Sequence, residues 1–162
     1  MIHAHQHLLS THHLCSTISK NMLTGSLPAS FSQLRSLVEF KCASNQLDGT
    51  IPKLAQLQMA QEYDLSSNKF SGPFPIDMVE LPLLVAFTVS KNELTGTLPS
   101  KFNKLQNLEL FLANSNQLSG TLPESLASLP KLQELDLTSN YLTGAVPGAF
   151  VANLAVHPSW YE

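Results

Sequence analysis

Cysteine is scarce in this chain of 162 residues, which contains only two, Cys15 and Cys42. Two cysteines can form at most one disulfide bond, so no disulfide framework holds the fold together and stability has to come from packing. Hydrophobic residues make up 43% of the sequence, which is enough for the continuous core of one ordered domain.

Long runs of one residue class are missing as well. No apolar run approaches the ~20 residues that a membrane-spanning helix needs, so we predict no membrane span in this chain. No five like charges follow one another, and the net charge of -3 leaves no basic patch, which excludes nucleic acid as a partner. Residues 1–9 also lack the basic start and the apolar stretch of ~7–15 residues that a secretory signal requires.

Histidine is missing from the body of the chain, because none occurs between residues 14 and 156. A serine or cysteine nucleophile there would have no histidine base, which argues against hydrolysis. The tract His3, His5, His7, His12 and His13 has no cysteine or carboxylate partner at a fixed spacing. We expect residues 1–11 to be disordered, with adventitious metal affinity at most, and predict no metal site and no cofactor.

What the chain does have is a repeat of about 24 residues. One asparagine recurs in each repeat, with a glycine four residues after it and a proline seven residues after it. The asparagines, called the Asn column below, are Asn21, Asn45, Asn68, Asn92, Asn116 and Asn140. Asparagine, glycine and proline that keep the same spacing in six repeats do not arise by chance.

Apolar residues fall in fixed columns around each asparagine. Residues three and five positions before it are apolar or small from the second repeat on, as in Phe40 and Cys42, and this period of two predicts a strand. Two further columns are predicted to face inward, at Leu23, Leu47, Phe70, Leu94, Leu118 and Leu142 and at Leu27, Ile51, Phe74, Leu98, Leu122 and Val146.

Each repeat is therefore predicted to hold a short strand, a turn closed by asparagine, a glycine-containing bend, and a return whose proline takes the first helical position. One repeat cannot bury its apolar columns alone, so neighbouring repeats stack and their strands pair at ~4.8 Å into one parallel sheet. We assign the Asn column a structural role, since buried amide side chains can satisfy backbone groups that a tight turn leaves unpaired.

Residues 132–147, LQELDLTSNYLTGAVP, resemble the plant-type leucine-rich repeat LxxLxLxxNxLxGxIP. The resemblance implies a right-handed α/β-type solenoid with a curved parallel sheet on its concave side and short helical or irregular turns on its convex side. It assigns six repeats to residues 12–154, which leaves residues 1–11 as an N-terminal segment and residues 155–162 as a tail. Receptor-like kinases, receptor-like proteins and polygalacturonase-inhibiting proteins share this pattern, and in them the concave face usually carries recognition.

The pattern is weakest at its two ends. His13 and Ser16 replace leucines in the first repeat, and Asn153 replaces the last inward leucine. The paired-cysteine cap of secreted relatives is also missing. We therefore expect apolar core to be open at both ends, and the chain to fray or self-associate there. The second repeat is one residue short between Pro52 and Leu57, in the return segment, where the strand register is unaffected.

Side chains that point outward from the strands form a mostly acidic face with one apolar patch and no aromatic residue. The lack of aromatic stacking platforms argues against sugars and favours a protein or peptide ligand. We predict ligand contacts from Glu39, Lys41, Glu62, Asp64, Thr88, Leu110, Leu112, Asn114, Glu134 and Asp136. The pairs Glu62/Asp64 and Glu134/Asp136 lie three repeats apart, too far to act on one bond, so we predict no enzyme activity.

Register also separates the two cysteines. Cys15 lies six residues before its asparagine, an outward position, and Cys42 lies three before, an inward one. Side chains on opposite sheet faces cannot be joined by a disulfide.

Two functions remain from this reading. The first is the non-catalytic recognition part of a receptor-like or inhibitor-like protein in signalling or defence, for which the resemblance implies an extracellular or membrane-anchored location. The second is a stand-alone intracellular scaffold, which the lack of any Asn-x-Ser/Thr glycosylation acceptor favours. The compartment stays undecided by sequence.

Overall fold

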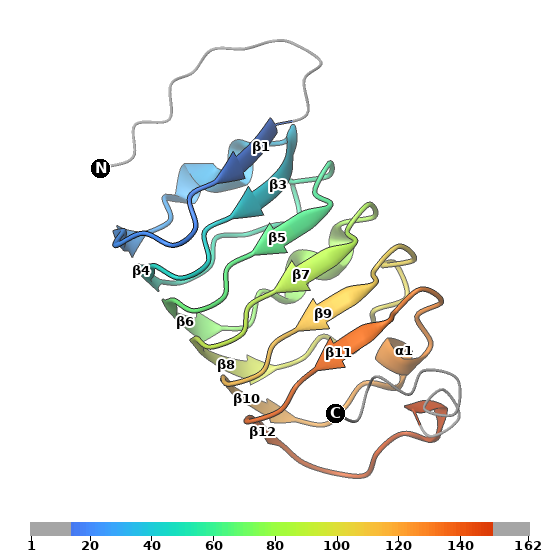
Figure 1. The fold of residues 1–162 in the computed structure, drawn as a ribbon. Helices are drawn as coiled ribbons and strands as arrows, with labels where there is room; N and C mark the ends of the chain where they lie inside the picture. The colour runs from blue at the N-terminus through green and yellow to red at the C-terminus, as the bar shows by residue number, and fades with distance from the viewer. Residues whose placement is uncertain (1–13, 151–162) are drawn as a thin grey trace.

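The computed structural model describes residues 14–150, which form a solenoid in which each repeat adds one strand to each of two parallel sheets (Figure 1). The first sheet has the order β1-β3-β5-β7-β9-β11, as the sequence predicts. Its strands are β1 (Leu14–Thr17), β3 (Leu37–Lys41), β5 (Glu62–Asp64), β7 (Ala86–Thr88), β9 (Leu110–Leu112) and β11 (Glu134–Asp136). All neighbouring strands in it are parallel.

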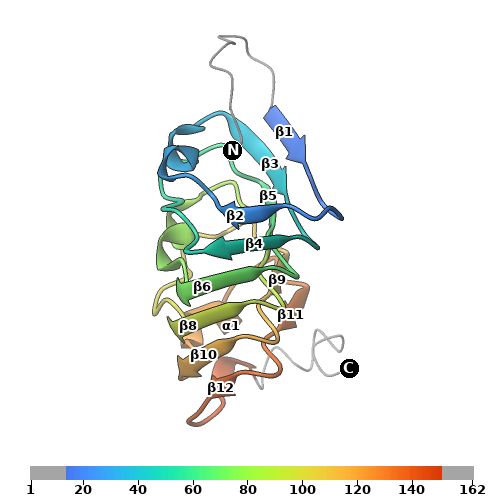
Figure 2. The same cartoon turned by 90° about the vertical axis from the view of Figure 1, so that its left-hand side faces the viewer.

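The second sheet was not predicted, because the sequence places a bend after each asparagine. Its order is β12-β10-β8-β6-β4-β2, and it forms another side of the solenoid (Figure 2). Its strands are β2 (Thr24–Ser26), β4 (Gln46–Gly49), β6 (Lys69–Pro73), β8 (Glu93–Thr97), β10 (Gln117–Gly120) and β12 (Tyr141–Leu142). Each of these strands has at most one buried residue, such as Leu94 in β8, and this gives too short an alternation to be recognised in the sequence.

The glycines that follow the Asn column by four residues lie within the strands of this second sheet, except Gly144, which follows β12. Gly120 has a φ of 85°, which non-glycine residues rarely adopt. A Cβ atom built on Gly120 would also lie only 3.0 Å from the Cγ2 atom of Thr97 in the preceding repeat. The glycine thus permits both the local backbone conformation and the close approach of neighbouring repeats.

Return segments close each coil between the second sheet and the next strand of the first (Figure 2). The returns of the first, third and fifth repeats contain the short helices η1 (Ala29–Gln33), η2 (Ile76–Glu80) and α1 (Glu124–Ala127), respectively. Proline directly precedes each helix as its N-cap, so the prediction that proline takes the first helical position is wrong by one residue. The returns of the second and fourth repeats are irregular.

The shortened second return is held by the repeat that follows it. Asp77 Oδ2, in η2, accepts hydrogen bonds from the backbone N–H groups of Leu54 and Ala55 at 2.8 and 3.1 Å. The deletion is therefore absorbed within the return segment, and β3 and β5 keep their regular pairing.

The core between the two sheets is continuous from repeat to repeat. Aromatic rings meet across repeat boundaries, with Phe31 4.7 Å from Phe40 and Phe74 6.1 Å from Phe111 between ring centroids. Each fully buried ring of this size contributes ~1.5–3 kcal/mol through the removal of its apolar surface from water.

Burial decreases toward the last described repeat. Leu135 and Leu137 are half-buried, although Phe111 and Ala113 occupy the same columns one repeat earlier and are fully buried. Val146, predicted to face inward, is 57% exposed, so that assignment is wrong for the sixth repeat. No following described repeat packs against these positions.

Neighbouring repeats are also joined by the side chains of the Asn column. Asn116 is buried; its Oδ1 atom accepts the N–H of Leu94 at 3.0 Å, and its Nδ2 atom donates to the carbonyl of Val89 at 2.9 Å. A third hydrogen bond, from Nδ2 to the carbonyl of Ala113 at 3.1 Å, closes the turn of its own repeat. The same pattern of bonds recurs at Asn45, Asn68, Asn92 and Asn140.

Asn21 is the exception in the described chain. It is exposed, and its Nδ2 atom donates only within its own repeat, to the carbonyls of Ile18 and Ser19 at 3.1 Å. It therefore provides a natural comparison for the asparagines that bridge two repeats.

We expect Asn116→Ala to lower the free energy of unfolding by ~1–3 kcal/mol, because it leaves buried backbone groups of two repeats unpaired. Asn21→Ala should change it by less than ~0.5 kcal/mol, as is usual for an exposed position. Denaturant unfolding of both variants measures the difference, and equal midpoints would contradict the bridging role.

Tyr63 places a hydroxyl in this core without a partner. The side chain is 1% exposed, its ring centroid lies 6.3 Å from that of Phe40, and its hydroxyl forms no hydrogen bond with the described residues. Burial raises the pKa of the phenol above its ordinary value, because the charged form would lose its hydration.

Removal of this hydroxyl is expected to stabilise the protein. Tyr63→Phe keeps the ring and relieves a buried unsatisfied group, so the free energy of unfolding should rise by ~1 kcal/mol. Tyr141→Phe removes a hydroxyl from a 68% exposed side chain and should have no measurable effect. Thermal and denaturant unfolding measure both variants, and a lower stability of Tyr63→Phe than of the original chain would contradict this prediction.

Candidate ligand-binding site on the first sheet

The parallel pairing of the first sheet aligns its outward side chains in rows that cross the strands. One row runs through Asp64, Thr88 and Leu112, and a second runs through Glu62, Ala86 and Leu110. Lys41 and Asp136 extend the first row on β3 and β11. A ligand lying across the sheet therefore meets side chains that are far apart in the sequence.

A shallow depression of about 400 Å³ crosses β5, β7 and β9 on this open face. Six of the predicted contact residues line it, namely Glu62, Asp64, Thr88, Leu110, Leu112 and Asn114. Thr88 and Ser90 are each 8% exposed and are enclosed by their neighbours, while Leu110 and Leu112 are half-buried. The depression thus has polar groups on one part of its lining and apolar groups on another.

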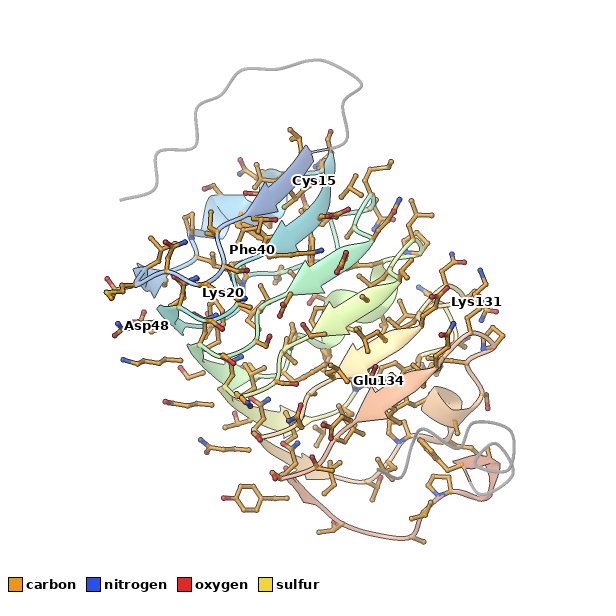
Figure 3. All side chains as sticks on the ribbon, in the orientation of Figure 1. Cys15, Lys20, Phe40, Asp48, Lys131 and Glu134 are labelled. Carbon is orange, nitrogen blue, oxygen red and sulfur yellow. The ribbon has the colours of Figure 1, made fainter. Side chains whose placement is uncertain are left out.

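The other four predicted contact residues lie outside this depression. Glu39 and Lys41 belong to β3, toward the first repeat, and Glu134 and Asp136 belong to β11, toward the last (Figure 3). They share the open face with the depression but do not line it.

Two turn residues that line the depression were not predicted. Ser67 and Lys91 each stand directly before an asparagine of the Asn column, with φ values of 54° and 55°. Positive φ is uncommon for residues other than glycine, and the tight turn that the asparagine closes imposes it at this position of all six repeats. Their position next to the Asn column is the signal that could have identified them.

Hydrogen bonds between neighbouring strands order the polar part of the depression. Asp64 Oδ1 accepts the backbone N–H of Ser66 at 3.1 Å, the Ser66 hydroxyl, and the Thr88 hydroxyl at 2.6 Å. The Ser90 hydroxyl donates to Asn114 Oδ1. These side chains are therefore preorganised before any ligand arrives.

Among the outward positions of the described strands of the first sheet, Lys41 is the one cation, and its neighbours neutralise it. Lys41 Nζ lies 2.8 Å from Glu62 Oε2 and 3.7 Å from Glu39 Oε2. The hydrogen bond to Glu62 raises the pKa of Lys41 above its ordinary value. The outward positions of the first sheet also contain five carboxylates, so the face is acidic overall. They belong to Glu39, Glu62, Asp64, Glu134 and Asp136.

Both cysteines are free, as their register predicts, with Cys15 exposed and Cys42 buried. Burial, together with the nearby charge of Asp64, raises the pKa of the Cys42 thiol to about 12. Cys15 lies on β1 at the opposite end of the face from Glu134 (Figure 3).

Within residues 14–150, no group of three or more histidine, cysteine or acidic side chains is placed to hold a metal ion. The same residues contain no helix with the length and apolar character to cross a membrane. The predicted histidine tract lies outside the described residues.

Comparison with known proteins identifies the family. The family model described as "Leucine rich repeat" matches residues 82–142. The ectodomain of the receptor kinase SOBIR1 from Arabidopsis thaliana is 30% identical with a TM-score of 0.73, over 80% of this chain and 72% of that one. The chain belongs to the leucine-rich-repeat family and has the solenoid fold of plant receptor-kinase ectodomains. No curated protein sequence matches it.

Two larger receptors have the same fold over most of this chain. A TDR receptor is 34% identical with a TM-score of 0.79, and the match covers 83% of this chain and 24% of the receptor. The Arabidopsis receptor kinase HAESA ectodomain, solved with an N-terminally extended IDA peptide hormone, is 32% identical with a TM-score of 0.82, over 84% and 23%. The chain thus spans about a quarter of the length of these receptors.

The two thiols should differ sharply in reactivity. At about pH 8 a thiol reagent should modify Cys15 in the native protein, whereas Cys42 stays protonated, buried and unmodified until the chain unfolds. Above the unfolded-state thiol pKa of ~8.5, only the unfolded chain ionises Cys42, so this thiol lowers stability progressively as pH rises toward about 12.

Mass spectrometry of the labelled protein checks this expectation. A Cys15→Ser variant serves as the matched control, because it retains only the buried thiol. Rapid labelling of that variant under native conditions would contradict the burial of Cys42.

Proposed function

We propose that this chain is a non-catalytic module that binds a protein or peptide on the open face of the first sheet. In this proposal it is the ligand-binding part of a receptor-like or inhibitor-like protein in signalling or defence. The observation that carries the proposal is the depression over β5, β7 and β9, in which two outward leucines lie beside a preorganised polar cluster.

Leu110 and Leu112 are the proposed anchors of the ligand. They occupy outward positions that Glu134 and Asp136 fill on the next strand, so they are not required to fill the core. Apolar side chains surrounded by polar ones on a recognition face bury their surface when a partner binds, and such residues dominate binding energy in many interfaces.

Structural relatives support a peptide as the ligand. HAESA was solved with a peptide hormone, and it has the same solenoid over 84% of this chain. The outward positions of the described strands of the first sheet contain no aromatic residue, which supports the same class of ligand, because sugars are commonly held by aromatic stacking. Because the similar solved structures are receptor ectodomains, we also propose that the chain lies outside the cell or is anchored to its membrane.

The spacing of the carboxylates supports a role in binding rather than catalysis. Glu62 and Asp64 lie on β5, and Glu134 and Asp136 lie on β11, with β7 and β9 between them. Three strand spacings of ~4.8 Å separate the pairs by ~14 Å, which is beyond the distance at which two carboxylates act on one bond.

The leucine pair provides the test. Peptides that bind the purified chain can be selected from a random library of about twelve residues displayed on phage. For peptides bound at this face, joint replacement Leu110→Ser and Leu112→Ser should weaken binding by ~1–4 kcal/mol, as expected for the loss of apolar anchors.

Ile76→Ser is the matched control, because it removes a 57% exposed apolar side chain from η2, away from the first sheet. It should leave the affinity unchanged. If every selected peptide binds the double leucine variant as tightly as the original chain, the open face of the first sheet is not the binding site. Unfolding measurements on both variants confirm that the fold is retained.

A further inference from the structure

The two oxygen atoms of Asp64 have different surroundings. Oδ1 accepts three hydrogen bonds, from the Ser66 backbone N–H, the Ser66 hydroxyl and the Thr88 hydroxyl. The backbone donor cannot rotate away, so it fixes the orientation of the carboxylate. Oδ2 accepts no hydrogen bond from residues 14–150 and is not among their buried, unpartnered polar atoms, so it is open to solvent in the depression.

No cation among residues 14–150 forms an ion pair with Asp64, although the charge of Lys41 interacts with it at longer range. Lys41, the neighbour of Asp64 in the row on β3, is bound to Glu62 at 2.8 Å. Lys91 lies at the edge of the depression, in the turn after β7, and none of the ion pairs among residues 14–150 joins it to Asp64.

A ligand that covers the depression removes water from Oδ2. A carboxylate that loses water without gaining a cation or a donor is strongly unfavourable, whereas a charge-assisted hydrogen bond from a lysine or arginine side chain offsets that loss. The acidic surroundings also favour a positively charged ligand, because five of the six charged residues in the outward columns of the first sheet are acidic.

We propose that Asp64 selects peptides that carry a lysine or arginine side chain three residues from a large apolar side chain, with the basic group on Oδ2 and the apolar group on Leu110 and Leu112. This inference rests on the proposed function and names the chemistry of its ligand. Asp64 becomes a specificity-determining residue, and the leucine pair becomes the anchor beside it.

The row spacing sets the separation of the two groups. Asp64, Thr88 and Leu112 are paired across β5, β7 and β9, so the first and last lie two strand spacings, ~9.6 Å, apart. A peptide in the polyproline II conformation that crosses the strands advances ~3.1 Å per residue and completes one turn in three residues, so side chains three residues apart lie ~9.3 Å apart on the same side of the peptide.

A second carboxylate continues the row beyond the leucines. Asp136 is paired with Leu112, and its Oδ1 accepts the Thr138 backbone N–H at 2.9 Å and the Thr138 hydroxyl at 2.7 Å. A second basic side chain beyond the apolar one would meet this carboxylate, in keeping with a cationic ligand.

The experiment uses the same phage-displayed peptide library, panned in parallel on the original chain and on an Asp64→Asn variant. The variant keeps an oxygen for the three donors and replaces only the free oxygen by an amide NH₂ group. Peptides selected by the original chain should be enriched in basic residues three positions from an apolar one, and should bind Asp64→Asn about ten-fold more weakly. Selection on Asp64→Asn should lose the basic residue and keep the apolar one.

Glu93→Gln is the matched control, because it removes one negative charge from β8 in the second sheet. It should change the dissociation constants by less than about two-fold, which separates contact at Asp64 from general attraction to an acidic protein. Equal losses in the two variants would overturn the inference.

The remaining outcomes separate this inference from the proposed function. Selected peptides that depend on the leucine pair but bind Asp64→Asn as well as the original chain would overturn the role of Asp64 and leave the binding face intact. A library that yields no peptide dependent on the leucine pair would overturn both.

Discussion

The hydrogen bonds of the Asn column are the constraint on which the rest of this structure depends. A solenoid has few contacts beyond adjacent repeats, so each repeat is positioned mainly by its neighbours. Apolar packing between repeats is strong but tolerates sliding, whereas the Oδ1 and Nδ2 atoms of Asn116 fit one backbone N–H and one carbonyl of the preceding repeat. This directional contact fixes the register of both sheets, and with it the rows of side chains on the open face.

The sequence predicts the parts of the fold that depend on period. The spacing of the Asn column and the alternation before it predict the six parallel strands of the first sheet, their order and their outward residues. The second sheet escapes prediction because its strands bury at most one residue each, and because five of them contain a glycine with positive φ, which indicates a bend. The predicted burial of Val146 is wrong for a different reason. Residues of its column are covered by the repeat that follows, and no described repeat follows Val146.

The candidate site is predictable only as a face. The outward columns name Asp64, Thr88, Leu110 and Leu112 from spacing alone. That the depression spans three strands and excludes β3 and β11 follows from side-chain size and hydrogen bonding, which periodicity does not encode. The unequal surroundings of the two Asp64 oxygens likewise follow from hydrogen bonds of Ser66, two residues later, and of Thr88, on the next strand, and spacing alone does not reveal these bonds.

The shortened return of the second repeat has a consequence for how such a chain can vary over evolution. Asp77 binds the backbone of the shorter loop, and β3 and β5 still pair in register, so a change of length in a return is not transmitted to the open face. Gain or loss of a whole repeat would likewise preserve the pairing of every strand that remains. The length of the face therefore changes in steps of one strand, ~4.8 Å, while the chemistry of each row changes independently by single substitutions.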